Sequence, residues 1–164
     1  MPPIGDDERR ARIVRLQQAM RAQGVQALYL DASTTSFYFT GLRLRGSERL
    51  HGVVIPAEGE IAYITPAFEA AKLQTMISLP GRIQCWHEHE DPIALVLETV
   101  RAMGHAAGTI AIDPVTPFFT FDGLRRAGRI SLSSRGYCAS RWTLPIANIL
   151  SWPPARMPPP EVSP

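Results

Sequence analysis

Four basic side chains, Arg43, Arg45, Arg49 and His51, follow one another closely in the chain. Guanidinium groups bind carboxylates through two parallel hydrogen bonds, so this cluster could recognise an anionic group on a substrate or on a neighbouring subunit. A loop exposed to solvent can have the same composition, and the sequence leaves that alternative open. Tyr38 precedes the cluster in a short aromatic segment and is the fifth candidate for a binding role.

The densest group of residues that commonly bind metals is His87-Glu88-His89-Glu90-Asp91. In an extended backbone His87 and His89 share a face and could chelate zinc or another divalent ion. That site would make the chain a small metal-dependent hydrolase. No third ligand stands at a recognised spacing, and a polar loop before a helix has the same residues. We therefore expect no cofactor or metal in this chain and keep the two histidines as the alternative.

Three other residues have side chains that could take part in chemistry. Cys85 and Cys138 lie far apart and match no metal or redox spacing, so free thiols in a reducing compartment are expected. A Cys–His nucleophile at Cys85 is disfavoured by the burying strand and by the lack of an orienting group. Asp113 ends a buried strand, where a carboxylate can be catalytic or can cap the following turn.

The composition excludes several classes of protein. The chain has 164 residues, of which 45% are hydrophobic and 20% are charged, and its net charge is +2, so we expect a globular domain without a nucleic-acid partner. No apolar run is long enough for a membrane span, and the acidic N-terminus lacks the apolar core of a signal peptide. A cytoplasmic protein with no membrane contact is predicted.

The elements that must position these residues alternate between helices and strands. Helices are predicted at 6–23, 66–77, 92–103 and 116–127, with a short helix capped by Ser33 and ended by Gly41, and strands at 25–30, 50–55, 60–65, 82–86, 109–112 and 129–132. This order predicts an α/β fold with helices on both faces of a mixed, mostly parallel sheet of about six strands. The one antiparallel pair is expected in a β-hairpin over 50–65.

The end of the chain has a different composition. Residues 6–140 are predicted to form the domain, and residues 141–164 are predicted to form an irregular, disordered, proline-rich tail, because six prolines stand in 153–164. Proline fixes φ and removes a backbone donor, so disorder or polyproline II is expected there. We favour a free end, and a binding module that presents this proline-rich tail to a partner is the alternative.

The order of these features resembles one known family. An arginine-rich helix leads to Val25-Gln26-Ala27-Leu28-Tyr29-Leu30, and then come Tyr38-Phe39-Thr40-Gly41, the arginine loop, the Gly59–Pro66 segment with Glu69, Trp86-His87-Glu88, Asp91-Pro92 and Ile110-Ala111-Ile112-Asp113. From Arg9 to Leu132 this succession is similar to the N-terminal domain of the creatinase, prolidase and aminopeptidase P family, and most similar to bacterial proline dipeptidases.

The resemblance implies a ribonuclease-H-like topology and a non-catalytic role in dimerisation and in shaping a substrate entrance. In the family this domain precedes a "pita-bread" catalytic domain that binds two divalent metals, often manganese, and hydrolyses Xaa-Pro bonds. The candidates Tyr38, Arg43, Arg45, Arg49 and His51 would then face the substrate entrance of a partner subunit. A proline-containing peptide would be the substrate of the full-length parent.

The chain departs from the family pattern at Arg141. The family continues with an Arg-x-x-Lys-Ser-x-x-Glu linker, whereas Arg141 is followed by Trp142-Thr143-Leu144-Pro145. A truncation or a change of reading frame would explain the break, and the Asp-Asp-His-Glu-Glu metal set is missing. We therefore expect this chain alone to be inactive, with a second copy or its missing catalytic domain as partner and with the metals only in that missing domain.

Overall fold

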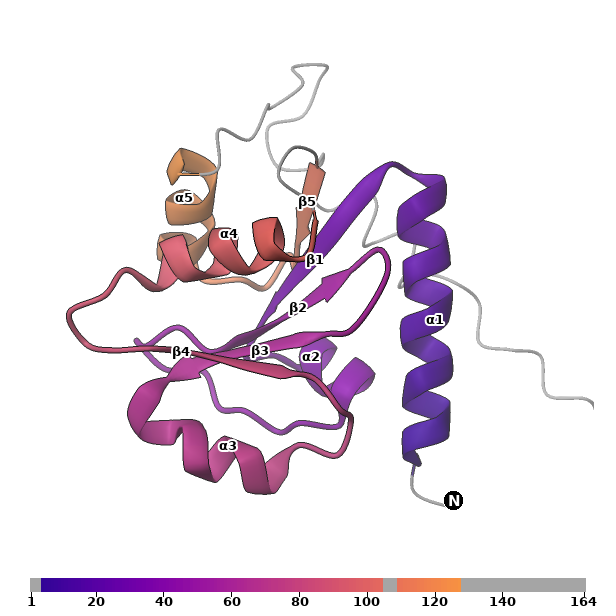
Figure 1. Ribbon diagram of the computed structural model, residues 1–164, viewed down its shortest axis with the longest axis horizontal. Coiled ribbons are helices and arrows are strands. Elements are labelled where there is room, and N and C mark those ends of the chain that lie inside the picture. The colour runs from indigo at the N-terminus through magenta and orange to yellow at the C-terminus, as the bar shows by residue number, and fades with distance from the viewer. Residues whose placement is uncertain (1–3, 105–108, 128–164) are drawn as a thin grey trace, which may run out of the picture.

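The computed structural model describes residues 4–104 and 109–127 (Figure 1). The helices are α1 (Asp6–Ala22), α2 (Thr34–Thr40), the 3-10 helix η1 (Ala67–Glu69), α3 (Ala70–Met76), α4 (Pro92–Ala102) and α5 (Phe118–Ala127), and the strands are β1 (Val25–Asp31), β2 (Gly52–Pro56), β3 (Ala62–Pro66), β4 (Arg82–Trp86) and β5 (Thr109–Ile112). The strands form one five-stranded sheet in the order β4-β3-β2-β1-β5.

The sheet is mixed, as predicted, but its parallel and antiparallel pairs are balanced. Strand β2 is antiparallel to both β1 and β3, while β4 is parallel to β3 and β5 is parallel to β1. The prediction of a single antiparallel pair was therefore wrong, because β2 also pairs with β1 and extends the hairpin into a meander. This meander, with β5 added beside β1, agrees with the ribonuclease-H-like topology. The predicted strand 129–132 and the proline-rich tail lie outside the described residues.

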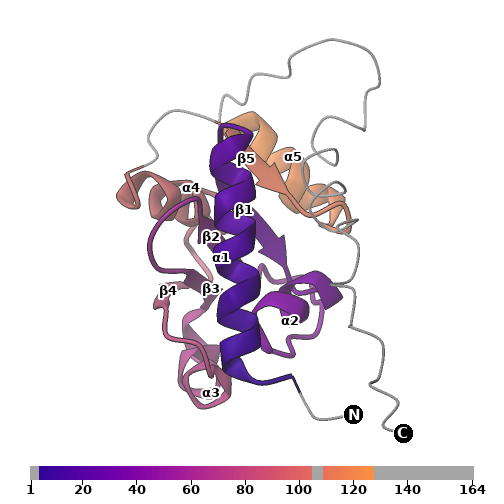
Figure 2. The ribbon, with the colours of Figure 1, turned by 90° about the vertical axis from the view of Figure 1, so that its right-hand side faces the viewer.

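Helices cover both faces of the sheet, which confirms the prediction of a layered α/β fold. Figure 1 shows α4 and α5 on one side of the sheet and α2 and α3 on the other, and Figure 2 shows α1 running along the sheet on the side of α2. The buried side chains Leu16 of α1, Phe39 of α2 and Leu73 of α3 belong to one hydrophobic cluster. Val96 of α4 and Leu124 of α5 belong to a second cluster on the opposite face.

Strand β3 shows how the sequence divides its side chains between these clusters. Successive residues of a strand point to opposite faces. Tyr63 accordingly packs in the cluster of α1 and α3, whereas Ala62 and Ile64 pack in the cluster of α4. The Tyr63 hydroxyl donates a hydrogen bond to the carbonyl of Leu79 at 3.0 Å, and burial raises the pKa of Tyr63 to about 12.

The short helix α2 sets the direction of the loop that follows it. The Ser33 hydroxyl accepts a hydrogen bond from the Ser36 amide, and the Ser36 hydroxyl accepts one from the Ser33 amide, which together form the capping box. Gly41 ends the helix at a φ of 73°, a conformation that glycine adopts without steric cost. The predicted cap and stop are both confirmed, and they fix where the loop that carries Arg43 and Arg45 begins.

Candidate functional site

A pocket of about 340 Å³ lies between helix α3 and the loop that joins α2 to β2. It is lined by Arg43, Leu44, Arg45, Gly46, Ser47, His51, Thr65, Glu69, Lys72, Leu73 and Met76. Arg43 and Arg45 come from the loop and Lys72 from α3, so elements far apart in sequence bring three cations to one hollow. The lining also contains leucine and methionine side chains, which makes part of its wall apolar.

His51 is the buried titratable group of this pocket, with only 5% of its surface exposed. Its Nδ1 lies 3.3 Å from the Thr65 hydroxyl, and its Nε2 lies 3.7 Å from a carboxylate oxygen of Glu69. Burial lowers the pKa of His51, the charges of Lys72 and Arg49 act in the same direction, and Glu69 opposes them. His51 is therefore a neutral hydrogen-bonding group at pH 7.

Two of the five predicted binding residues lie outside the pocket. The Nε of Arg49 donates a hydrogen bond of 2.8 Å to Glu88, and its guanidinium lies 5.5 Å from the centre of the Phe68 ring. The ring of Tyr38 is covered by the guanidinium of Arg12 at 4.0 Å. The structure thus gathers Arg43, Arg45 and His51 and places Arg49 and Tyr38 in other contacts.

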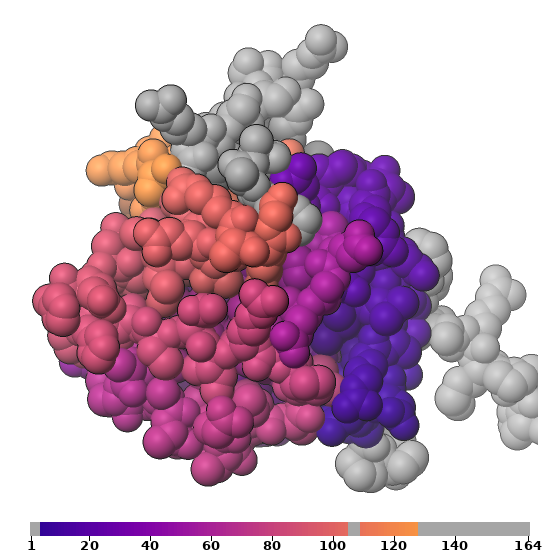
Figure 3. All heavy atoms as spheres, in the orientation of Figure 1, coloured from indigo at the N-terminus to yellow at the C-terminus, as the bar shows by residue number. Residues whose placement is uncertain are grey.

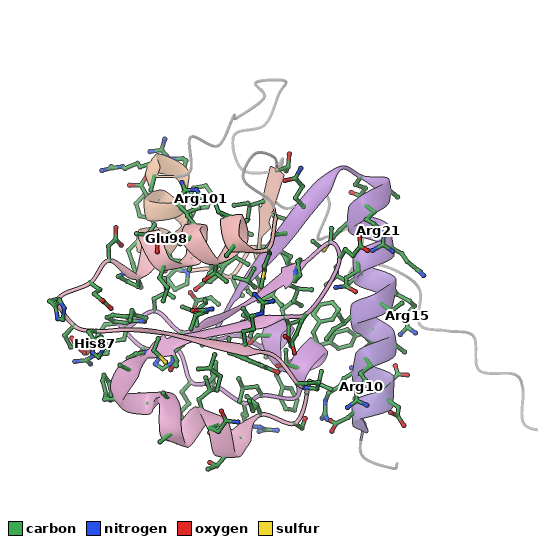
Figure 4. The ribbon with its side chains drawn as sticks, in the orientation of Figure 1. Arg10, Arg15, Arg21, His87, Glu98 and Arg101 are labelled. Carbon is green, nitrogen blue, oxygen red and sulfur yellow. The ribbon has the colours of Figure 1, made fainter. Side chains whose placement is uncertain are left out.

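The histidine-rich segment forms a turn, and the extended backbone on which the chelation hypothesis relied is not present. The amide of Glu90 donates to the carbonyl of His87 at 2.8 Å, and the His87 amide donates to the Glu90 carboxylate at 2.7 Å. The His87 and His89 rings stack with their centroids 5.8 Å apart. Figure 4 places His87 at the end of β4, across the molecule from Arg10, Arg15 and Arg21 on α1. Across 4–104 and 109–127, no three His, Cys, Asp or Glu side chains are grouped closely enough to hold a metal ion.

Two buried carboxylates lie at the ends of the neighbouring strands β1 and β5. Asp113 accepts a hydrogen bond from the Ser33 hydroxyl at 2.9 Å and one from the Val115 amide at 3.3 Å, which favours the turn-capping interpretation. Asp31 accepts one from the Ala32 amide at 2.8 Å. Burial raises the pKa of Asp31 and the charge of Asp113 adds to that effect, while hydrogen bonds from Ala32 and Tyr29 oppose it.

Asp31 is a buried carboxylate that the sequence analysis does not name as a candidate functional residue. The available signal was an aspartate that directly follows the apolar strand Val25–Leu30, as Asp113 follows the strand Thr109–Ile112. Parallel neighbouring strands bring such residues together at one sheet edge. Cys85 is partly buried, and burial raises the pKa of its thiol, which disfavours a nucleophilic role. Cys138 lies outside the described residues.

The surface has two further features that bear on function. In the described part of the chain, no helix combines the length and the apolar character needed to cross a membrane. Three large apolar side chains near the start of α5 are strongly exposed: Val115 by 62%, Phe118 by 77% and Phe119 by 52%. Figure 3 shows α5 at the edge of the molecule, on the side away from α1.

Comparisons with known proteins identify the relatives of this chain. The family model described as the Creatinase/Prolidase N-terminal domain matches residues 12–134. A search of curated proteins found no match.

Solved structures share the fold at low sequence identity. Dipeptidase PepE from Mycobacterium ulcerans has a TM-score of 0.70 and 23% identity over 79% of this chain and 34% of that chain. Prolidase from Thermococcus sibiricus has a TM-score of 0.64 and 21% identity over 79% of this chain and 33% of its own. The N-terminal domain of Xaa-Pro dipeptidase from Lactobacillus brevis has a TM-score of 0.64 and 18% identity over 82% of this chain and 98% of its own. This chain thus spans about a third of the first structure and nearly all of the isolated domain.

Proposed function

Because this chain belongs to the creatinase/prolidase N-terminal domain family, we propose that it is a non-catalytic module of an Xaa-Pro dipeptidase-like protein. Its role would be to hold subunits together and to shape a substrate entrance. The similar dipeptidase and prolidase chains are about three times as long as the matched region, which supports a role as one part of a larger assembly. The parent would act on proline-containing peptides with a pair of manganese-type metal ions held elsewhere.

The observation that carries this proposal is the exposed apolar surface at the start of α5. Phe118 and Phe119 are adjacent at the start of α5, and Val115 stands in the turn three residues before Phe118. Exposed groups of large apolar side chains commonly mark protein–protein contacts, because contact removes them from water. We therefore assign Val115, Phe118 and Phe119, here called the α5 patch, to the surface that contacts a second copy of this chain.

The alternative of a stand-alone hydrolase at His87 and His89 has less support. The two rings stack beside a turn, and the described residues offer them no third ligand. A module that presents the proline-rich tail would depend on residues outside the described part of the chain. No observation favours either alternative over the contact role.

Sedimentation equilibrium of the full chain tests the contact role. We expect a reversible dimer, and we expect Phe118→Asp with Phe119→Asp to raise its dissociation constant at least about tenfold, since two apolar anchors become charged. Both positions are exposed, so circular dichroism should show an unchanged fold.

Phe68→Asp is the matched control, because Phe68 is a phenylalanine with 62% exposure on a different element, η1. It should leave the dissociation constant unchanged. A wild-type chain that stays monomeric at every concentration, or a dimer that the α5 substitutions do not weaken, would contradict the proposed contact role.

A further inference from the structure

We propose that the pocket between α3 and the 43–47 loop is a carboxylate-binding site. Its ligand would be a small molecule with one carboxylate and a short apolar body, a chemistry shared by a peptide C-terminus and a free carboxylic acid. The inference rests on the proposed function in one respect: the loop that lines the pocket is the part assigned to the substrate entrance. The pocket itself lies within this chain, so binding can be measured without a partner.

The first reason is that, in the described part of the chain, the three cations of the pocket form no ion pair. Other arginines of the described chain pair with carboxylates, as Arg9 does with Asp6 and Arg125 with Asp122, both within 2.8 Å. Among the described residues, no ion pair within 4.0 Å includes Arg43, Arg45 or Lys72. Three like charges around one hollow repel one another, and a bound anion removes that repulsion.

The negative charge inside the pocket is too small to neutralise these cations. Among the described residues that line the pocket, Glu69 is the single acidic one, and its carboxylate faces the Nε2 of His51. With His51 neutral, the formal charge of the lining side chains is three positive and one negative. A singly charged ligand would therefore bring the pocket closer to neutrality without placing two negative charges beside Glu69.

The second reason is the mixed character of the walls. Met76 of α3 is 38% exposed, so it offers apolar surface that a ligand can cover, whereas Leu73 of the same lining is already buried at 3% exposure. Thr65 and His51 supply buried polar atoms. Inorganic phosphate would satisfy the cations and leave the apolar wall in water. A carboxylate with an aliphatic body satisfies both, because ligand pockets combine apolar walls with a few placed polar groups.

The guanidinium of Arg43 packs against an aromatic side chain that restricts its orientation. Its guanidinium lies 4.8 Å from the centre of the Phe37 ring, in a cation–π contact from α2. Such a contact fixes the plane of the guanidinium and leaves its N–H groups free for a carboxylate. Arg49 differs, because Glu88 already occupies its Nε. The carboxylate site therefore consists of Arg43, Arg45 and Lys72 and does not include Arg49.

An NMR titration of the full chain at low ionic strength tests this site. The probes are N-acetyl-leucine, which carries the carboxylate, and N-acetyl-leucinamide, which has the same body without the charge. We expect saturable amide shifts in the 43–47 loop and in α3 with the acid, and at least about tenfold weaker binding of the amide, since it cannot form charge-assisted bonds. Acetate and inorganic phosphate are titrated in parallel to separate the contributions of charge and body.

Variants link the binding to the named cations. Arg43→Gln and Arg45→Gln should each weaken binding of N-acetyl-leucine by at least about fivefold, because each removes one charge-assisted contact. The control is Arg101→Gln, since Arg101 on α4 also lacks a carboxylate partner among the described residues but lies outside the pocket lining (Figure 4). It should leave binding unchanged.

Several outcomes would overturn the inference. Equal binding of the acid and the amide, shifts that lie outside the pocket, or an affinity that Arg43→Gln and Arg45→Gln do not change would each exclude a carboxylate site. Tighter binding of phosphate than of N-acetyl-leucine would exclude the proposed ligand class. If the wild-type chain forms a dimer but does not bind N-acetyl-leucine, only the carboxylate site is contradicted. If the chain is monomeric and binds N-acetyl-leucine in the pocket, the carboxylate site is supported and the contact role is contradicted.

Discussion

Replacing Gly52 by alanine is expected to lower the free energy of unfolding by at least about 3 kcal/mol, the upper range for overpacking a core. Gly52 begins β2 and pairs with Asp31 of β1 and Ile64 of β3. A Cβ placed on it would lie 2.6 Å from the carbonyl oxygen of Leu30 and 2.7 Å from the ring and hydroxyl of Tyr29. The backbone there is held on both sides by the sheet, so it cannot move away cheaply.

Chemical denaturation followed by circular dichroism measures this effect. Gly46→Ala is the control, because the nearest atom to a Cβ at Gly46 is a backbone oxygen 4.0 Å away. We expect that variant to stay within about 0.5 kcal/mol of the wild type, as surface substitutions usually do. Equal stability of the two variants would show that β2 does not lie between β1 and β3 as described.

Replacing Leu124 by alanine is expected to cost about 2–5 kcal/mol of unfolding free energy, the range for truncating a fully buried leucine. Leu124 is 1% exposed and packs in the same cluster as Val96 and Val100 of α4. The substitution leaves a cavity between α5 and the sheet, because α4 and the strands are held by their own contacts. Thermal and urea unfolding of the full chain measure the loss.

The same helix supplies the control for this prediction. Phe118 is 77% exposed, so Phe118→Ala should change stability by less than about 0.5 kcal/mol although it removes a larger side chain. A cost for Phe118→Ala equal to that for Leu124→Ala would mean that α5 packs with another face toward the sheet.

Local features of this fold were readable from the sequence because single residues determine them. The strand Arg82–Trp86 has the predicted bounds, and α4 begins at Pro92 after its cap Asp91, whose side chain accepts a hydrogen bond from the Ile93 amide. Ser33 and Gly41 begin and end α2 as predicted. In each case a capping side chain or a residue with a preferred φ determines where the helix begins or ends. The sequence next to that boundary is therefore enough to predict it.

Element bounds shifted where neighbouring structure competes with local preference. The helix predicted at 66–77 became η1 followed by α3, because Pro66 still pairs with Trp86 as the end of β3. The strand predicted from Leu50 begins at Gly52, and the helix predicted from Thr116 begins at Phe118. These differences are small, and they leave the order of the elements unchanged.

Long-range pairing could not be derived from the same signals. The direction of β2 relative to β1 depends on the path of the 41–51 connection, and the sequence does not encode that path in any local pattern. Arg49 was grouped with Arg43 and Arg45 because they are close in the chain, but its partner Glu88 comes from the loop after β4. Lys72, which completes the pocket, was missed because it stands on α3, far from the arginine loop.

The structure places only part of the predicted basic cluster in one pocket. Arg43, Arg45 and His51 line one pocket, while Arg49 stabilises the neighbouring loop through Glu88. The α5 patch and the carboxylate site lie on different elements, so contact and ligand binding can be changed independently. The roles that we propose for them are contact with a partner and binding of a ligand, and neither role requires this chain to break a bond.

Hydrolysis of an Xaa-Pro dipeptide by the purified full chain, with and without manganese, tests this central claim most directly. We expect no turnover above the protein-free control at any manganese concentration, while N-acetyl-leucine still produces shifts in the pocket. The double variant His87→Asn and His89→Asn is assayed beside the wild type to detect a contaminating peptidase. Manganese-dependent hydrolysis that the wild type shows and this variant lacks would contradict the non-catalytic role and establish the histidine segment as the active site.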